Sequence, residues 1–376
     1  ILRPKKSTTA QLCPPKTVMK LEVKKLNLKY PSGEKALSDV SLETDGVIAV
    51  VGAEKSGKTS LLRCIAGLES FSGEVLLSGE KLQNIPAECR DIQLFFENFS
   101  VFENKTVFSN LAYPLKIRGE RFSEIKSKVD SVALDFGLYD VLEFKAKRLT
   151  EDQKRAVALA RLFLRDAKFT LLDDPAAGFS KKASGEAFSR VKKAALKKSG
   201  VVVYATQNIG EAFEIADKAV FLNFGQVKQT GSMEDMYYRP SFVVVAEAFG
   251  DYNKVETTLC ADGDKLFVTL FGKKITLAKT PEDLLSEDYI GKKVIVGFRY
   301  SGVKAVPSSA TENGANIYRF SEFLSKCGKY VGKVETELGD IFVETDEKFG
   351  GEFTLSVESA GINLFDVLSE GSITIS

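Results

Sequence analysis

The sequence predicts an α/β domain with a parallel sheet, followed by a smaller all-β domain. Continuous runs of aliphatic and β-branched residues recur at 46–51, 169–172 and 201–204, as expected of strands buried on both faces. Stretches with helical periodicity stand between these runs, and this alternation is typical of parallel α/β sheets. After about residue 250, short β-rich segments separated by Gly and Asp turns indicate a separate small β-barrel domain.

The organisation along the chain follows from these patterns. Residues 1–18 carry basic residues, no acidic ones and a Pro-Pro pair, which predicts a disordered tail, with contact to acidic lipid as the alternative. Residues 21–30 alternate like a strand, and helices are expected near 59–67 and 124–136. We therefore predict an α/β domain at 19–250, with a helical subdomain at about 90–165, and a β domain at 251–376.

Composition excludes several kinds of chemistry. The chain has 376 residues, a net charge of +1, five cysteines and no histidine. Imidazole bases and Cys/His zinc sites are therefore excluded, and the charge gives no global field that favours nucleic acid. No apolar run approaches the roughly 18 residues that a membrane span needs, so any work at a membrane requires other chains.

A phosphate-binding loop is the strongest motif. Residues 52–59 read GAEKSGKT, which matches GxxxxGK[ST] between a buried strand and a helix. Backbone N–H groups of such a loop, here Gly52, Ser56 and Gly57, form an anion nest at a helix N-terminus. Lys58 would contact the β- and γ-phosphates, and the Thr59 hydroxyl would ligate Mg²⁺. Ser60 follows directly on the helix.

A carboxylate pair completes this kind of site. Residues 169–172 form an apolar strand that ends in Asp173 and Asp174, followed by Pro175. Asp173 is expected to hold Mg²⁺, and the alternative for two aspartates at this place is an ordinary turn.

Taken together, these motifs resemble the nucleotide-binding domain of ABC transporters over about residues 20–250. Residues 149–153 (LTEDQ) look like the family signature LSGGQ, and residues 205–212 look like its switch segment. The resemblance implies that Tyr30 stacks on adenine, with a strand-edge aromatic as the alternative. It also implies that Thr150 and Gln153 face the nucleotide of a partner ATP-binding subunit, and that the cofactors are ATP and Mg²⁺.

The C-terminal part suggests a subgroup. Residues 296–299 (VGFR) and 363–366 (NLFD) look like β segments of the OB-like regulatory barrel on sugar-importer ATPases, although a generic β domain is the alternative. This resemblance implies a peripheral subunit at the cytoplasmic face of the membrane. Its expected partners are transmembrane permease subunits and a second ATP-binding subunit, in a homodimer or a heterodimer.

Several active positions depart from the family pattern. Asp174 stands where the family has its catalytic glutamate, and Gln207 stands where it has the switch histidine. Glu97 replaces the Q-loop glutamine, and it either ligates the metal or points to solvent. A displacement of about 1 Å, such as one lost methylene could produce, can cost roughly a hundredfold in rate. Gln207 retains a hydrogen bond but cannot carry positive charge.

The signature and its surroundings are changed as well. Glu151 and Asp152 replace the two glycines of LSGGQ, and the family's D-loop aspartate falls at Ser180. Carboxylates facing a triphosphate would repel it by up to about 3 kcal/mol each unless they turn outward. In the phosphate loop, Lys55 stands where the family has glycine, and it either compensates Glu54 or adds a phosphate contact.

Two hypotheses remain open at the level of sequence. In the first, the chain is an importer ATPase whose active-site residues are changed but still hydrolyse ATP. In the second, it is a structural or regulatory subunit that binds ATP and does not hydrolyse it. A P-loop kinase is disfavoured because it leaves residues 149–161 unexplained. Six aromatic residues between 95 and 115 suit either a permease-docking groove or ordinary core packing: Phe95, Phe96, Phe99, Phe102, Phe108 and Tyr113.

Overall fold

The fold is taken from a computed structural model, which describes residues 19–83, 85–96, 99–198, 200–307, 316–326, 328–348 and 350–375. The tail at 1–18 and Glu97 lie outside the described residues. The chain divides into two compact units. The first comprises residues up to Ile48 together with Thr59–Tyr204, and the second comprises Ala49–Lys58 together with residues from Ala205 onward.

An antiparallel sheet opens the first unit, with strand order β2-β1-β4-β5. Its strands are β1 (Leu21–Lys29), β2 (Lys35–Thr44), β4 (Ser72–Leu77) and β5 (Glu80–Lys81). Leu21, Val23, Leu26 and Leu28 of β1 are buried, with irregular alternation because β-bulges interrupt the pairing with β2. The predicted strand at 21–30 is thus present.

A second sheet contains β3 (Val47–Val51) and β8 (Val201–Thr206). Its order is β3-β8-β7-β6 in the first unit, with β7 (Phe169–Asp173) parallel to β6 (Ile92–Phe95). Every residue of β7 and β8 is buried, which explains their continuous apolar sequences.

In the second unit the same sheet has the order β10-β9-β3-β8. Strands β9 (Lys218–Asn223) and β10 (Gln226–Ser232) are antiparallel, so the sheet is mixed and not wholly parallel as predicted. The reason is the two-residue connection: Phe224 and Gly225 have φ values of 45° and 73°, the left-handed geometry of a tight hairpin.

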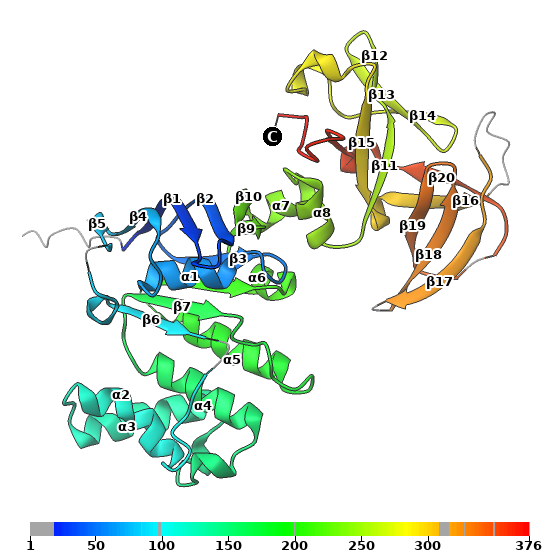
Figure 1. Cartoon of the computed structure of the whole chain (residues 1–376). Coiled ribbons are helices and arrows are strands. Elements are labelled where there is room, and N and C mark those ends of the chain that lie inside the picture. The colour runs from blue at the N-terminus through cyan, green and yellow to red at the C-terminus, as the bar shows by residue number, and fades with distance from the viewer. Residues whose placement is uncertain are drawn as a thin grey trace, which may run out of the picture. The chain divides into compact units, whose positions relative to one another are not determined.

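The first unit contains five α-helices in its described residues. They are α1 (Lys58–Ala66), α2 (Val107–Ile117), α3 (Phe122–Asp135), α4 (Glu151–Phe163) and α5 (Ser184–Leu196). Three of them, α2, α3 and α4, fall within residues 90–165. Helices α2, α3 and α4 pack against one another beside β6 and β7 (Figure 1). The side chain of Thr106 caps α2 by accepting a hydrogen bond from Ser109 N.

The second unit continues with short helices and then with strands. The helices are α6 (Ile209–Ile215), α7 (Met233–Tyr238) and α8 (Val243–Ala248). The strands are β11 (Tyr252–Thr258), β12 (Cys260–Asp262), β13 (Lys265–Leu270), β14 (Lys273–Thr276), β15 (Lys293–Arg299), β16 (Val303–Pro307), β17 (Phe320–Lys326), β18 (Lys329–Thr336), β19 (Gly339–Thr345), β20 (Phe353–Val357) and β21 (Asn363–Phe365).

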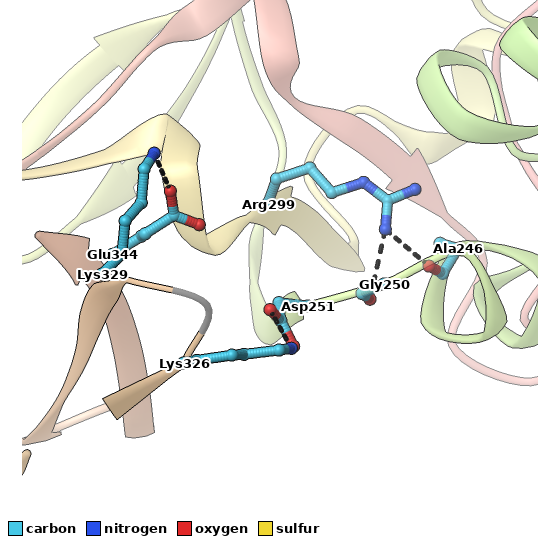
Figure 2. Close-up of polar contacts among 7 residues, drawn as sticks. All are labelled: Ala246, Gly250, Asp251, Arg299, Lys326, Lys329 and Glu344. Atoms are coloured by element: carbon cyan, nitrogen blue, oxygen red, sulfur yellow. Dashed lines mark hydrogen bonds and ion pairs between the residues drawn. The ribbon is translucent and has the colours of Figure 1, made fainter. Parts of the chain in front are cut away.

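One arginine joins the helices of this unit to its strands. Arg299, the last residue of β15, donates hydrogen bonds to the carbonyls of Ala246 and Gly250 (Figure 2), and to that of Tyr237. Next to it, the ammonium group of Lys326 pairs with Asp251 (Figure 2), and Lys329 pairs with Glu344. The segment α7–α8 is therefore attached to β15 by specific polar contacts. Within the described ranges, no helix is both long and apolar enough to span a bilayer.

Candidate functional site

The loop between β3 and α1 has the backbone geometry of a phosphate cradle. Gly57 has a φ of 103°, and Lys55 has a φ of 62°, which is unusual for a residue with a side chain. A Cβ on Gly52 would lie 2.3 Å from the carbonyl oxygen of Leu222 and 2.7 Å from Ser56 Oγ, so only glycine fits there. The turn after β9 also holds the loop, because Gly225 N donates to Ser56 O at 2.9 Å.

Lys58 is buried and folded back over this loop. Its Nζ donates to Gly52 O at 2.8 Å and to Ala53 O at 2.9 Å. Ser56 Oγ is also buried, and within the described residues it has no hydrogen-bond partner. Because an unsatisfied buried hydroxyl is costly, a polar ligand at the loop would stabilise it. A cation, an orphaned hydroxyl and a helix N-terminus thus converge, and this donor set fits a phosphate group.

Two residues at the start of α1 follow the loop, and one of them contacts Tyr30. Thr59 is exposed, and Ser60 Oγ lies 3.1 Å from the Tyr30 hydroxyl. Tyr30 follows β1 directly and is half-buried, in a turn closed by a hydrogen bond from its N–H to Glu34 O. Its ring is therefore positioned by α1, which is compatible with the stacking role that the family resemblance implies.

The predicted carboxylate pair straddles the end of β7. Asp173 is the last residue of the strand and is buried, with 4% of its surface exposed. Asp174 has a φ of 42°, in the left-handed region that aspartate tolerates better than most residues, and its carbonyl accepts from Ala177 N. The chain therefore turns sharply at Asp174, while Asp173 remains anchored in the sheet.

The altered signature forms the first turn of α4. Thr150 and Gln153 build a capping box: Thr150 Oγ1 accepts from Gln153 N at 3.2 Å, and Gln153 Oε1 accepts from Thr150 N at 3.0 Å. Both side chains thus cap the N-terminus of their own helix. Glu151 points outward and pairs with Lys154 Nζ at 2.9 Å.

Asp152 is fixed instead of being free to swing outward. Its carboxylate accepts hydrogen bonds from Ser180 Oγ at 2.6 Å and Ser180 N at 3.0 Å. The hydrogen bonds from Ser180 hold the pKa of Asp152 below its usual value, so the side chain is ionised at neutral pH. The signature turn therefore carries its own fixed negative charge at the helix N-terminus.

Arg155, one turn further along α4, is a residue that the sequence analysis missed. Its guanidinium lies 4.8 Å from the ring centroid of Phe99 and 5.8 Å from that of Phe179. A Cβ on Gly178 would lie 2.3 Å from the same guanidinium, so this glycine makes room for the arginine. No local pattern signals this arrangement, because its members are far apart in the sequence.

The predicted switch residue lies at the carboxyl end of β8. Gln207 is exposed and follows the buried Thr206. The next residue, Asn208, caps α6 through its side chain. Thr206 Oγ1 donates to Glu211 Oε2 at 3.2 Å, so the turn on which Gln207 sits is braced from both sides.

The structure brings some predicted site residues into contact. Gly52 contacts both Ser56 and Lys58, Tyr30 contacts Ser60, and Thr150 contacts Gln153. No ion pair within the described residues joins Glu54 to Lys55. The second unit contains Gly52, Lys55, Ser56, Gly57, Lys58 and Gln207. The first unit contains Tyr30, Thr59, Ser60, Thr150, Gln153, Asp173 and Asp174.

Aromatic residues line a groove of about 500 Å³ next to α2, α4 and β6. Five of the six predicted aromatic side chains contribute: Phe95, Phe96, Phe99, Phe102 and Tyr113. Phe108 instead packs near Phe122, with ring centroids 6.3 Å apart. Arg161 lies over the Phe102 ring at 5.5 Å, and burial lowers its pKa.

Comparisons with known proteins identify what the chain is similar to. Residues 37–177 match the family model described as ABC transporter. The sn-glycerol-3-phosphate import ATP-binding protein UgpC of Rhodopseudomonas palustris is 33% identical over 262 residues, which cover 68% of this chain and 71% of that protein. The corresponding UgpC of Vibrio cholerae is 33% identical over 233 residues, and the match spans only 63% of its length.

A longer match includes the C-terminal strands. The oligosaccharides import ATP-binding protein MsmX of Bacillus subtilis is 28% identical over 364 residues, 91% of this chain and 96% of that protein. Among solved structures, cbiO1 from Clostridium perfringens, part of the ABC transporter complex cbiONQ, has a TM-score of 0.53 and 21% identity. That match covers 58% of this chain and 90% of cbiO1, and it shows a common fold.

Proposed function

The chain belongs to the family of ABC transporter ATP-binding proteins, and from this premise we propose that it binds MgATP as the nucleotide-binding subunit of an importer. The relatives named as import proteins for sn-glycerol-3-phosphate and oligosaccharides favour a carbohydrate-type importer. The proposed position is peripheral, at the cytoplasmic face of the membrane.

The observation that carries ATP binding is the loop at 52–58. It combines a lysine folded over backbone carbonyls, an orphaned buried hydroxyl at Ser56 and a helix that starts at Lys58. In the proposed complex, Lys58 exchanges its carbonyl partners for phosphate oxygens, and loop N–H groups donate to them. Tyr30 supplies the face on which adenine stacks.

Residues for the metal fit the same proposal. Mg²⁺ bound with the nucleotide supplies charge neutralisation to the phosphates. Thr59 offers an exposed hydroxyl and Asp173 a carboxylate at a strand end, and oxygen ligands of these kinds suit Mg²⁺. Lys55 lies exposed on the same loop and is proposed as a further phosphate contact.

We further propose that hydrolysis is slow. Asp174 is one methylene shorter than the family's glutamate, and its carboxylate must orient the attacking water from that shorter reach. Gln207 provides a hydrogen bond without positive charge, and Glu97 adds a carboxylate in place of an amide. Each change weakens positioning or charge stabilisation during phosphoryl transfer.

A second candidate function is a subunit that binds ATP without hydrolysing it and pairs with an intact paralogue. The observation that favours it is the pair Asp152–Ser180, because the fixed carboxylate occupies the helix N-terminus that the family offers to a partner's nucleotide. This surface would repel a triphosphate instead of binding it. An intact partner would then have to supply the catalytic groups.

Other parts of the chain are also compatible with an importer subunit. Aromatic side chains in the groove beside α2 and α4 are suited to an apolar segment of a permease subunit, and we propose this groove as the permease contact. We propose the domain limits 19–250 and 251–376, with the helical subdomain at about 90–165. What supports an OB-like barrel is that strands from all four C-terminal sheets share one apolar core.

The test measures ATP binding and steady-state hydrolysis on the purified chain, with and without Mg²⁺. Lys58→Ala should weaken ATP binding at least about tenfold, whereas Lys218→Ala, an exposed lysine on β9, should leave it unchanged. The revertant Glu151→Gly/Asp152→Gly/Asp174→Glu/Gln207→His should raise turnover at least about a hundredfold.

The outcomes separate the candidates. No ATP binding by the native chain, or binding that ignores Lys58→Ala, would overturn the proposal as a whole. Slow turnover that the revertant raises supports a weakly active importer subunit. Turnover that stays absent until an intact ATP-binding subunit is added supports the second candidate. Native turnover as fast as that of the revertant contradicts slow hydrolysis.

A further inference from the structure

The second unit contains a polar pocket that the nucleotide site does not use. Its volume is about 460 Å³, within the range typical of small-molecule sites. It lies where the segment after α7 meets the loop after β14 and the chain after β21. Its side chains are mostly polar or charged, and its apolar contribution is limited to Pro240, Ala278 and Ile375.

Two cations converge in this pocket. Lys279 is half-buried, and both burial and the nearby positive charge of Arg239 lower its pKa, although Asp283 opposes them. Nζ of Lys279 donates one hydrogen bond, to Thr374 Oγ1 at 3.0 Å, although an ammonium group has three donors. The guanidinium of Arg239 makes no hydrogen bond or ion pair within the described residues. Like charges held together without a paired anion are costly, and an anion between them would remove that cost.

The one carboxylate of the pocket is committed elsewhere. Asp283 Oδ2 accepts from Thr280 N at 2.7 Å and from Thr280 Oγ1 at 3.0 Å. These bonds hold the pKa of Asp283 below its usual value. No ion pair joins Asp283 to Lys279 or Arg239 in the part of the chain that the structure describes. The pocket therefore keeps an excess positive charge.

The walls that carry these groups are held by hydrogen bonds. Gln229 bridges the two sides of Pro240, because its Nε2 donates to Arg239 O at 3.0 Å and its Oε1 accepts from Ser241 N at 2.9 Å. Ser241 O in turn accepts from Ser372 N at 2.8 Å. On the facing wall, the hydroxyls of Ser372 and Thr374 lie 3.2 Å apart. The polar groups are thus preorganised, which lowers the entropic cost of binding.

We propose that this pocket binds a small phosphate-bearing anion, with Arg239 and Lys279 as the groups that hold the phosphate. Arginine supplies a planar fork for phosphate oxygens and lysine a compact charge. Ser372, Thr374 and Asn363 supply hydroxyl and amide groups that suit the hydroxyls of a sugar phosphate. Among the described residues that line the pocket none is aromatic, so these residues offer no stacking surface for a nucleobase. The site goes beyond the proposed ATP binding and is independent of it.

The test uses isothermal titration calorimetry on the full chain carrying Lys58→Ala, so that the loop at 52–58 does not itself bind the probes. The probes are glucose 6-phosphate, inorganic phosphate and, as the neutral control, glucose. Arg239→Gln and Lys279→Met remove one charge each while retaining much of the side chain. Lys292→Met, on the exposed turn before β15, is the matched control.

We expect binding of one phosphate-bearing probe per chain and none of glucose. Arg239→Gln and Lys279→Met should each weaken binding at least about tenfold, with no change for Lys292→Met. Glucose 6-phosphate binding more tightly than inorganic phosphate assigns the site to a sugar phosphate, and equal binding assigns it to free phosphate. Absence of binding, or binding that both charge removals leave unchanged, overturns the proposal. If Lys279→Met does not fold, the exposed Arg239→Gln decides.

Discussion

Arg299 organises its surroundings through a single planar group. Its guanidinium donates to carbonyls of Tyr237, Ala246 and Gly250 at 2.8, 2.7 and 3.2 Å. The rings of Tyr237 and Tyr252 lie near it, with centroids at 4.2 and 4.9 Å. Burial lowers the pKa of Arg299, but a guanidinium remains charged under any ordinary condition. Lysine cannot reproduce this fork of donors.

Replacing Arg299 with lysine should therefore destabilise the chain. We expect Arg299→Lys to lower the free energy of unfolding by about 2–4 kcal/mol, since hydrogen bonds from a charged group and two ring contacts are lost together. Urea unfolding measures the change. Arg319→Lys is the matched control, because Arg319 is 73% exposed and pairs with Glu352 at the surface, and it should cost less than about 0.5 kcal/mol. Equal effects at the two positions would contradict this role.

Gly52 tests the shape of the phosphate loop. Gly52→Ala places a methyl group against Leu222 O, a backbone atom in a strand that cannot easily shift. We expect ATP affinity to fall at least about tenfold and stability by about 1–3 kcal/mol, because the loop must deform. Fluorescent ATP titration and urea unfolding check both. Gly46→Ala, at the opposite end of β3, meets no atom within 4 Å and should change neither.

At the scale of elements, the first turn of α4 is stabilised by its own side chains. Its capping box and two carboxylates suit a helix N-terminus, where negative charge is favourable. The family's glycines would leave this turn open to a partner's phosphate but would weaken the helix. The sequence of α4 thus favours a stable helix N-terminus.

Returning glycine to this turn should therefore cost stability. Asp152→Gly loses two hydrogen bonds to Ser180 and also helix propensity, and we expect a loss of about 1–2 kcal/mol. High salt should reduce the difference, since the carboxylate is near the surface. Glu124→Gly, in the first turn of α3, is the control, because it loses helix propensity and Glu124 makes no side-chain hydrogen bond or ion pair within the described residues. If urea unfolding shows similar losses of unfolding free energy for both variants, the contact with Ser180 has no stabilising role.

The elements differ in how far the sequence predicts them. Strands β7 and β8 are buried on both faces, so their apolar runs alone predict them. The loop at 52–59 is predicted by its own sequence motif. The resemblance to the family indicated a strand pair around Gly225, but its antiparallel direction was not predicted, because Phe224-Gly225 is not a common hairpin signal. The bond between Asp152 and Ser180 joins residues 28 positions apart, and only tertiary packing determines such a contact.

For the whole molecule, the absence of histidine determines how stability depends on pH. Histidine is the only side chain whose ordinary pKa lies between about pH 5 and 8, and this chain has none. In the described part of the chain, six carboxyl groups have lowered pKa values: Glu22, Asp135, Asp152, Glu186, Asp283 and Asp366. For Asp135, burial acts to raise the pKa, but Lys197 and Lys193 outweigh it.

We therefore expect stability to be nearly constant from about pH 6 to pH 8 and to fall only outside that range. A carboxyl with a lowered pKa stabilises the fold above its unfolded value, and this contribution is lost as the pH falls through the folded value, here below about pH 4. The Cys64 thiol acts in the opposite direction: burial raises its pKa from 9.0 to about 12, so its contribution is lost as the pH rises through that interval. Urea midpoints across the pH range measure the profile. Asp135→Asn should flatten the acid side, and a fall centred near pH 6.5 in the native chain would contradict the argument.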